Sequence, residues 1–206
     1  MDEEKIALLR KLQEDDDLNE EPLEKVQVVI NKSKTSNCLF DWMQCILVAV
    51  VAVVIVLTFF FRMVNVDGDS MNDTLTNLDK VIVTDLFYEP NDLDIVVISH
   101  GQDYPQPIIK RVIATAGQTL DINFDTGEVV VDGVVLQEDY ISSETIQGNA
   151  EIPSVIPEGY VFVMGDNRAI SLDSRFNQIG LVPVTDIIGK AQFVVFPFSD
   201  FGYLYD

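Results

Sequence analysis

An uncharged apolar run of 20 residues, residues 42–61, constrains this chain more than any other feature of its sequence. A helix needs about 20 apolar residues to cross the hydrocarbon core of a bilayer. The run ends in Phe-Phe-Phe-Arg-Met, which lacks the small residues of a signal-peptide cleavage site, and the segment before it is too long for a cleaved leader. We therefore expect residues 38–62 to form a permanent transmembrane anchor helix.

The basic residues on the two sides of this run predict its orientation. They are Lys25, Lys32 and Lys34 before the run and Arg62 directly after it. Because positively charged flanks stay on the cytosolic side, we expect the polar tail of residues 1–37 in the cytosol and residues 63–206 outside it. The sequence thus predicts a single-pass protein of the plasma membrane, in contact with membrane lipid.

After the anchor, the sequence changes to short β-branched runs separated by turn residues. The clearest is Val-Val-Val-Asp-Gly-Val-Val-Leu at residues 129–136, which predicts a strand, an Asp-Gly turn and a second strand. No stretch of residues 63–206 shows ten residues of clean helical period. We therefore expect a mainly β domain of antiparallel sheets after the single transmembrane helix, with a polar, loop-rich insertion at residues 137–156.

The charge of residues 63–206 excludes some classes of partner and ligand. This part of the chain has 23 Asp and Glu against 6 Lys and Arg, and a domain this acidic repels phosphate backbones. We therefore expect no nucleic-acid partner. The only cysteines, Cys38 and Cys45, belong to the anchor, and His100 is the only histidine, so neither a structural zinc site nor another cofactor is expected.

The motif Gly68-Asp69-Ser70-Met71 contains the first candidate for catalysis. Ser70 is a candidate nucleophile, although a Gly-x-Ser motif taken alone is more often an ordinary turn. A serine hydroxyl also needs a base that removes its proton. A Ser-His-Asp triad would have to use His100, which falls where a strand enters a turn and is more simply read as an exposed turn residue.

Lys110 is the other candidate base. It begins the segment Lys-Arg-Val-Ile-Ala at residues 110–114, in which Lys110 and Arg111 would point to opposite faces of a strand, one inward and one outward. A lysine base must be neutral, and burial among apolar neighbours could lower its pKa from about 10.4 to roughly 8. Without a further motif, an exposed strand lysine is the simpler interpretation.

A third segment, residues 165–175, is dense in small, polar and charged residues and directly follows a predicted strand. Such a loop is either solvated, with Asp–Arg pairs, or supports an active site. In their order and spacing, three blocks of this chain resemble the type I signal peptidases of bacteria. The blocks are GDSMNDTL at residues 68–75, KRVI at residues 110–113 and GDNRAISLDSR at residues 165–175.

The resemblance implies a serine–lysine peptidase with an antiparallel β-sheet catalytic domain. Ser70 would attack the scissile carbonyl, Lys110 would act as the general base, and Ser171 would hydrogen-bond to the lysine and orient it. The backbone N–H groups of Gly68 and Ser70 would form the oxyanion hole. The other implied site residues are Arg111 paired with Asp166 and Asp173 paired with Arg175, which support the site, and Met71, which lines the pocket for the −1 residue.

The implied substrates are secreted preproteins with small residues at positions −1 and −3, bound as an extended strand. An alternative is a catalytically idle, membrane-anchored accessory or assembly protein derived from such a peptidase. The joint presence of Ser70, Lys110 and Ser171 favours the active enzyme. A self-cleaving repressor with related chemistry would need an N-terminal DNA-binding domain, where this chain has a predicted anchor.

Overall fold

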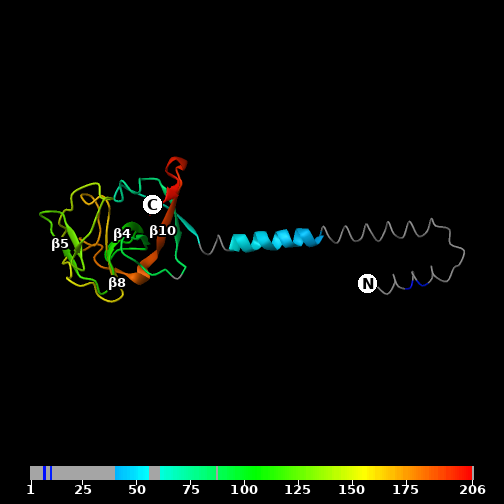
Figure 1. The fold of residues 1–206 in the computed structure, drawn as a ribbon, viewed down its shortest axis with the longest axis horizontal. Helices are drawn as coiled ribbons and strands as arrows, with labels where there is room; N and C mark the ends of the chain where they lie inside the picture. Colours follow the sequence, from blue (N-terminus) through cyan, green and yellow to red (C-terminus); the bar gives the residue numbers. More distant parts are fainter. Residues whose placement is uncertain (1–6, 8–9, 11–39, 56–60, 87, 206) are drawn as a thin grey trace. The chain divides into compact units, whose positions relative to one another are not determined.

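The computed structural model describes residues 7, 10, 40–55, 61–86 and 88–205 (Figure 1). The chain consists of two compact units, residues 1–55 and residues 56–206, and each is described separately. Apart from Ala7 and Arg10, the predicted cytosolic tail of residues 1–37 lies outside the described residues.

A helix covers residues 40–55, which include the first part of the expected transmembrane segment. All of its residues are exposed, among them Trp42 and Ile46. Within the described ranges, no helix is both long enough and apolar enough to span a bilayer. The expected anchor also contains residues 38–39 and 56–60, which the structure does not describe.

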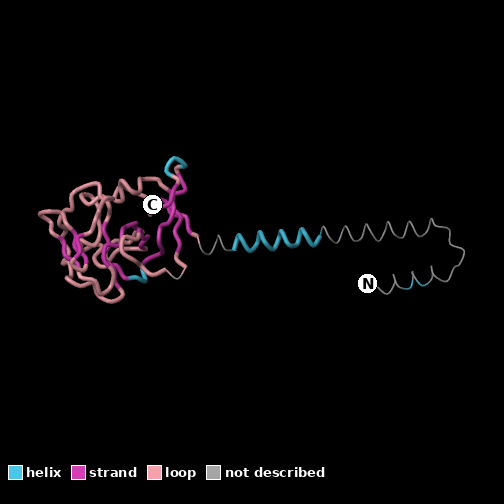
Figure 2. Tube along the Cα trace, viewed as in Figure 1, coloured by secondary structure: helices cyan, strands magenta, loops and turns pink. Residues whose placement is uncertain are grey.

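Eight antiparallel strands form the main sheet of the second unit (Figure 2). They are β1 (Arg62–Asn65), β2 (Lys80–Thr84), β3 (Ile95–Ile98), β4 (Ile108–Ala114), β8 (Tyr160–Met164), β9 (Val182–Pro183), β10 (Ile187–Phe196) and β11 (Gly202–Tyr203). Their order is β1-β2-β10-β3-β4-β8-β9, and β11 pairs with β10. Short 3-10 helices, η1 (Val184–Asp186) and η2 (Phe198–Asp200), flank β10. The expectation of a mainly β, antiparallel domain is confirmed.

A second sheet of three strands contains the predicted hairpin. It consists of β5 (Leu120–Ile122), β6 (Val129–Val131) and β7 (Val134–Val135). Asp132 and Gly133 connect β6 to β7 with φ angles of 52° and 78°, the positive values that a two-residue type I′ turn requires. Local turn chemistry therefore fixes this hairpin, as the sequence predicts.

The core of the main sheet explains how a lysine becomes buried. All four residues of β3 are buried, and β4 is buried from Lys110 to Ala114. Successive β4 side chains pack into different hydrophobic clusters, Val112 in one and Ile113 in another. Lys110 is 3% exposed and Arg111 is 5% exposed. The expectation that one of the two side chains faces outward is wrong, because β4 is a central strand whose two faces are both covered.

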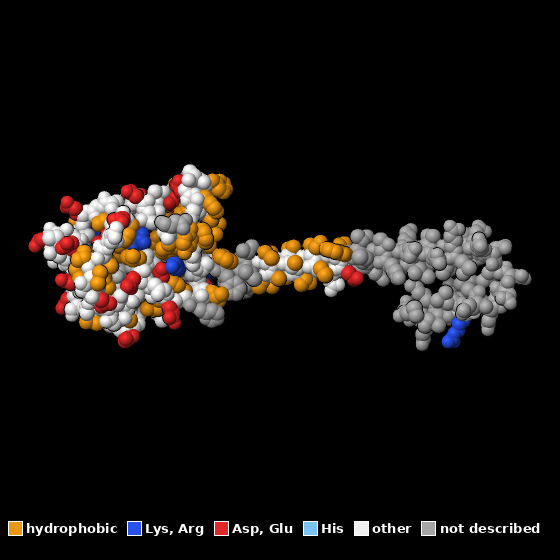
Figure 3. All heavy atoms as spheres, in the orientation of Figure 1, with side chains coloured by type: hydrophobic (Ala, Val, Ile, Leu, Met, Phe, Trp, Pro, Cys, Tyr) orange, Lys and Arg blue, Asp and Glu red, His pale blue; other side chains and the backbone are white. Residues whose placement is uncertain are grey.

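Acidic side chains are spread over the visible surface of this unit (Figure 3). Four aspartates are instead buried: Asp79, Asp94, Asp166 and Asp173. Each accepts hydrogen bonds from neighbouring groups, as buried carboxylates must if their desolvation is to be offset. Two of the four, Asp166 and Asp173, lie beside the candidate nucleophile and base.

Candidate active site

Ser70 lies in the loop that connects β1 to β2. Gly68 has a φ angle of 93°, a left-handed conformation that glycine adopts without steric cost. The loop then turns, and the N–H of Leu75 donates to the carbonyl of Met71 at 2.8 Å. Met71 and Leu75 are buried in the core, so the two apolar side chains hold the turn that presents Ser70.

The side chain of Lys110 reaches Ser70 from the central strand β4. The Lys110 Nζ atom lies 2.8 Å from the Ser70 Oγ atom and donates to the carbonyl of Ile109 at 2.9 Å. Burial lowers the pKa of Lys110 from 10.5 to about 8, although the nearby charges of Asp173 and Asp166 act in the opposite direction. A substantial fraction of the amine is therefore neutral just above neutral pH, in hydrogen-bond contact with a serine hydroxyl.

Two buried ion pairs hold the loop of residues 165–175. The guanidinium of Arg111, next to Lys110 on β4, binds both carboxylate oxygens of Asp166, at 2.9 and 2.6 Å. Asp173 binds Arg175 through two contacts of 2.8 Å and also accepts the N–H of Gly165 at 3.0 Å. The structure thus contains both pairs that the sequence suggests.

The same loop contacts the segment that carries the nucleophile. The N–H of Asn167 donates to the carbonyl of Ser70 at 3.1 Å, and the hydroxyl of Thr74 donates to Asp166 at 2.5 Å. Three segments distant in sequence therefore meet at one place: the Ser70 loop, strand β4 and the 165–175 loop.

Ser171 does not make the hydrogen bond to Lys110 that the resemblance implies. Its side chain is buried, but its Oγ atom has no hydrogen-bond partner among the described residues, Lys110 included. The Ser171 side chain packs instead against Gly165, where a Cβ atom would lie 2.2 Å from Oγ. The loop backbone thus brings Ser171 into close contact with Gly165 rather than into a hydrogen bond with the lysine.

The two backbone groups expected in an oxyanion hole differ in their availability. The N–H of Gly68 donates to the Asn77 side-chain oxygen at 3.1 Å, so it is already bonded. The N–H of Ser70 makes no hydrogen bond within the described part of the chain. Of these two donors, only that of Ser70 is free to bind a substrate oxygen.

A cleft of about 260 Å³ is lined in part by Ser70 and Lys110. Its walls come mainly from residues 64–71 and residues 106–110, and Ile170 and Leu172 of the 165–175 loop complete the lining. Met71, the residue expected at the −1 pocket, lines this cleft. The cleft therefore runs between the end of β1 and the start of β4 and reaches the Ser70–Lys110 contact.

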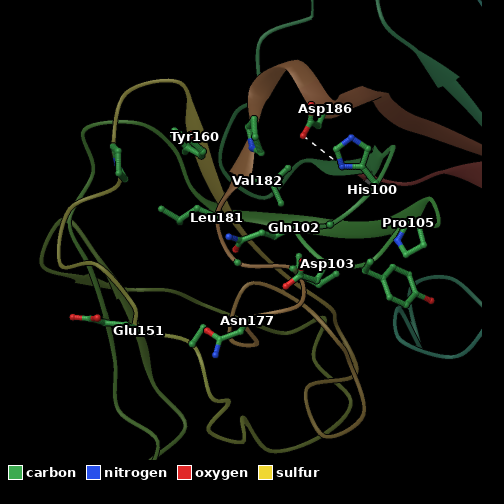
Figure 4. A pocket seen from close by; sticks show the side chains of 17 residues that line it. His100, Gln102, Asp103, Pro105, Glu151, Tyr160, Asn177, Leu181, Val182 and Asp186 are labelled. Atoms are coloured by element: carbon green, nitrogen blue, oxygen red, sulfur yellow. Dashed lines mark ion pairs between the residues drawn. The ribbon is translucent and has the colours of Figure 1, made fainter.

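His100 lies elsewhere. It lines a larger cavity of about 980 Å³, to which neither Ser70 nor Lys110 contributes. In this cavity the His100 ring faces Asp186, with its Nδ1 atom 3.7 Å from the carboxylate (Figure 4). Within the described residues, no three His, Cys, Asp or Glu side chains are grouped so that they could hold a metal ion.

Three further residues belong to the site but were not singled out from the sequence. Arg168 is fully buried, donates from Nε to the carbonyl of Gly165 at 3.0 Å and forms an ion pair with Glu138. The ring centroid of Tyr140 lies 4.0 Å from the Arg111 guanidinium carbon. Arg168 could have been suspected from its place in the 165–175 loop, whereas Glu138 and Tyr140 come from an irregular segment without a periodic signal.

Comparison with known proteins gives one consistent result. The family model described as signal peptidase, peptidase S26, matches residues 39–196. A signal peptidase I of Bacillus licheniformis is 34% identical over 80% of this chain and 92% of its own length. A probable signal peptidase I of Synechocystis is 40% identical over 77% of this chain and 83% of its own.

A solved structure of a signal peptidase I from Enterococcus faecalis is 28% identical to this chain. The match has a TM-score of 0.42 and covers 50% of this chain and 97% of that one. From the family model and the curated relatives, we conclude that the chain belongs to the signal peptidases of peptidase family S26, serine peptidases that remove signal peptides from preproteins.

Proposed function

We propose that this signal peptidase cleaves with Ser70 as nucleophile and Lys110 as general base. The contact of 2.8 Å between Lys110 Nζ and Ser70 Oγ carries this proposal. Neutral Lys110 takes the hydroxyl proton as Ser70 attacks the scissile carbonyl, and then gives that proton to the leaving amine. The acyl-enzyme on Ser70 is hydrolysed by water, with Lys110 again accepting a proton.

The burial of Lys110 supports its role as the base. A pKa that falls from 10.5 to about 8 corresponds to a net destabilisation of the charged form by about 3 kcal/mol, and burial is its largest cause. Arg111 and Arg175 partly offset the negative charges of Asp166 and Asp173, which favour the protonated amine. Arg111, Asp166, Asp173 and Arg175 thus support the base without touching the substrate.

The free N–H of Ser70 is the donor we assign to the oxyanion hole. It stands on the nucleophile itself, so it faces the carbonyl that Ser70 attacks. Gly68 has a different role in this proposal, because its N–H is held by Asn77. The bond between Gly68 and Asn77 stabilises the loop that carries Ser70.

The cleft beside Ser70 suits an extended peptide with small side chains. Its volume is about 260 Å³, and residues 64–68 and 106–110 supply most of its lining. A preprotein strand between these segments can form main-chain hydrogen bonds with them, and Met71 in the lining would limit the size of the −1 residue. We propose cleavage after small residues at −1 and −3.

The proposed setting is the outer face of the plasma membrane, with the N-terminus in the cytosol. The uncharged run of residues 42–61 and the basic residues before it support a single-pass anchor in membrane lipid. The acidic surface of the domain argues against a nucleic-acid partner.

The test is cleavage of a peptide with an Ala-x-Ala site by the full chain in detergent. Wild type should cleave after the second alanine, and Ser70→Ala and Lys110→Ala should each lose activity by at least a thousandfold, the scale seen when a member of such a catalytic unit is removed. Full activity of either variant would refute the dyad. Inactivity of folded wild type towards several preprotein peptides would favour the idle accessory protein.

A further inference from the structure

A short stretch of the irregular insertion, residues 138–143, lies over the 165–175 loop. We call it the covering segment. Its contacts with the loop are made by backbone and side chains alike. The N–H of Ser142 donates to the carbonyl of Asp166 at 3.2 Å. The hydroxyl of Ser143 donates to the Asn167 side chain at 3.0 Å and accepts the N–H of Ala169 at 2.9 Å.

Tyr140 is the central side chain of the covering segment. Its ring centroid lies 4.0 Å from the guanidinium carbon of Arg111 and 6.0 Å from that of Arg168. The Tyr140 hydroxyl donates to Glu138 at 3.0 Å, and Glu138 forms the ion pair with Arg168. One aromatic ring therefore contacts two arginines and is fixed at its polar end by the counter-ion of the second.

Each of these arginines binds one side of the start of the loop. Arg111 binds the side chain of Asp166, and Arg168 binds the carbonyl of Gly165 at 3.0 Å. Both arginines are buried, so the groups that pack on them must stabilise their positive charges in place of water. Tyr140 supplies such a group for both.

The covering segment also reaches the nucleophile loop. The hydroxyl of Ser142 donates to the carbonyl of Asn72 at 2.7 Å, two residues after Ser70. Asn167, held by Ser143, donates its N–H to the carbonyl of Ser70. The segment is thus hydrogen-bonded to both the Ser70 loop and the 165–175 loop. The relative position of these loops determines whether Ser70 stays in contact with Lys110.

We infer that Tyr140 is a positioning residue for peptide cleavage, which acts through Arg111 and Arg168 to hold the 165–175 loop and the Ser70 loop in reacting geometry, with Glu138 and Ser142 as its partners. The inference rests on the serine–lysine mechanism proposed above. None of residues 138–143 is among the described residues that line the cleft. The covering segment therefore affects turnover and leaves peptide binding unchanged.

The test compares Tyr140→Leu with Tyr140→Phe in the full chain, with an Ala-x-Ala peptide as substrate. Tyr140→Leu removes the ring from both arginines, and we expect kcat to fall at least tenfold with KM unchanged, since small misplacements of reacting groups cost rate steeply. Tyr140→Phe keeps the ring and loses only the bond to Glu138, so its kcat should stay within about fivefold of wild type. A wild-type kcat in Tyr140→Leu, or an equal loss in both variants, would overturn the inference.

Two further variants complete the experiment. Tyr160→Leu is the matched control, because Tyr160 is also a partly exposed tyrosine but lines the cavity that contains His100; we expect wild-type kcat. If Tyr140→Leu does not fold, Ser142→Ala decides instead. Ser142 is exposed, and among the described residues its hydroxyl bonds only the carbonyl of Asn72. Its loss should lower kcat about threefold to tenfold with KM unchanged, and an unchanged kcat would reject the role.

This outcome is separable from failure of the proposed mechanism. If Ser70→Ala or Lys110→Ala retains full activity, the dyad is wrong whatever Tyr140 does. If both are inactive while Tyr140→Leu turns over like wild type, the dyad stands and the role of Tyr140 is rejected.

Discussion

The Nζ atom of Lys110 lies 2.8 Å from the Oγ atom of Ser70, and the carbonyl of Ile109 is its only other hydrogen-bond partner in the described ranges. No carboxylate among those residues forms an ion pair with this buried amine, since Asp166 and Asp173 are each paired with an arginine. Protonated Lys110 therefore has no carboxylate partner that would keep its proton in place. Once it is neutral, it lies within reach of the hydroxyl proton of Ser70.

The pH dependence of cleavage should report the titration of Lys110. Protonated lysine cannot act as a base, and its pKa is about 8, so kcat/KM should rise through a midpoint near pH 8 and level off above it. The measurement is peptide cleavage by the full chain between pH 6 and 10. A flat profile over this range would argue against a lysine base.

The same group should make stability depend on pH. Between pH 8 and 10.5, the unfolded chain keeps a proton on Lys110 that the folded chain has released, so the free energy of unfolding rises with pH in this window. Lys110→Met, which removes the desolvation cost, should be more stable than wild type by about 1–3 kcal/mol at pH 7. Chemical unfolding at pH 7 and pH 10.5 checks this, and the advantage should shrink at the higher pH.

The ion pair between Arg111 and Asp166 should be costly to break on one side only. Asp166→Asn leaves a buried guanidinium without its counter-charge, and the free energy of unfolding should fall by about 3–5 kcal/mol. The matched control is Asp85→Asn, which breaks the solvent-exposed pair with Arg62 at the surface and should cost less than about 1 kcal/mol. Equal effects of the two changes would contradict the structural role of Asp166.

Gly165 should not tolerate replacement by alanine, which adds only a methyl group. A Cβ atom there would lie 2.2 Å from Ser171 Oγ and 2.5 Å from the carbonyl oxygen of Ser70, so Gly165→Ala must push the loop away from the nucleophile. Cleavage should fall at least a hundredfold. Gly202→Ala, whose Cβ atom would have no neighbour closer than 3.9 Å, should cleave like wild type. Normal turnover by Gly165→Ala would mean that this contact does not control the site.

Local features of the fold are the ones that the sequence predicts well. The turn at Asp132 and Gly133 depends on two adjacent residues that tolerate positive φ, and the hairpin is where the pattern places it. The approach of Lys110 to Ser70 is also anticipated, through a resemblance carried by three short blocks. The burial of Arg111 is not, because strand alternation cannot tell whether one face or both faces of a strand are covered.

The contacts around the 165–175 loop lie mostly beyond the reach of the sequence. Tyr140 and Glu138 come from a segment with no regular secondary structure, so no period indicates which side chains turn inward. Their partners, Arg111 and Arg168, are distant in the chain. The missing bond of Ser171 is a matter of side-chain geometry, which depends on how tightly Gly165 packs and not on residue type.

The position of β10 in the sheet has a consequence for the time at which activity arises. Ser70 follows β1 and Lys110 lies on β4, and between those strands the sheet runs through β2, β10 and β3. A nascent chain that has emerged only as far as Ile187 contains every residue of the proposed site but lacks the strand that joins its two halves. The proposed site therefore cannot reach its final geometry until β10 has been synthesised and has paired with β2 and β3.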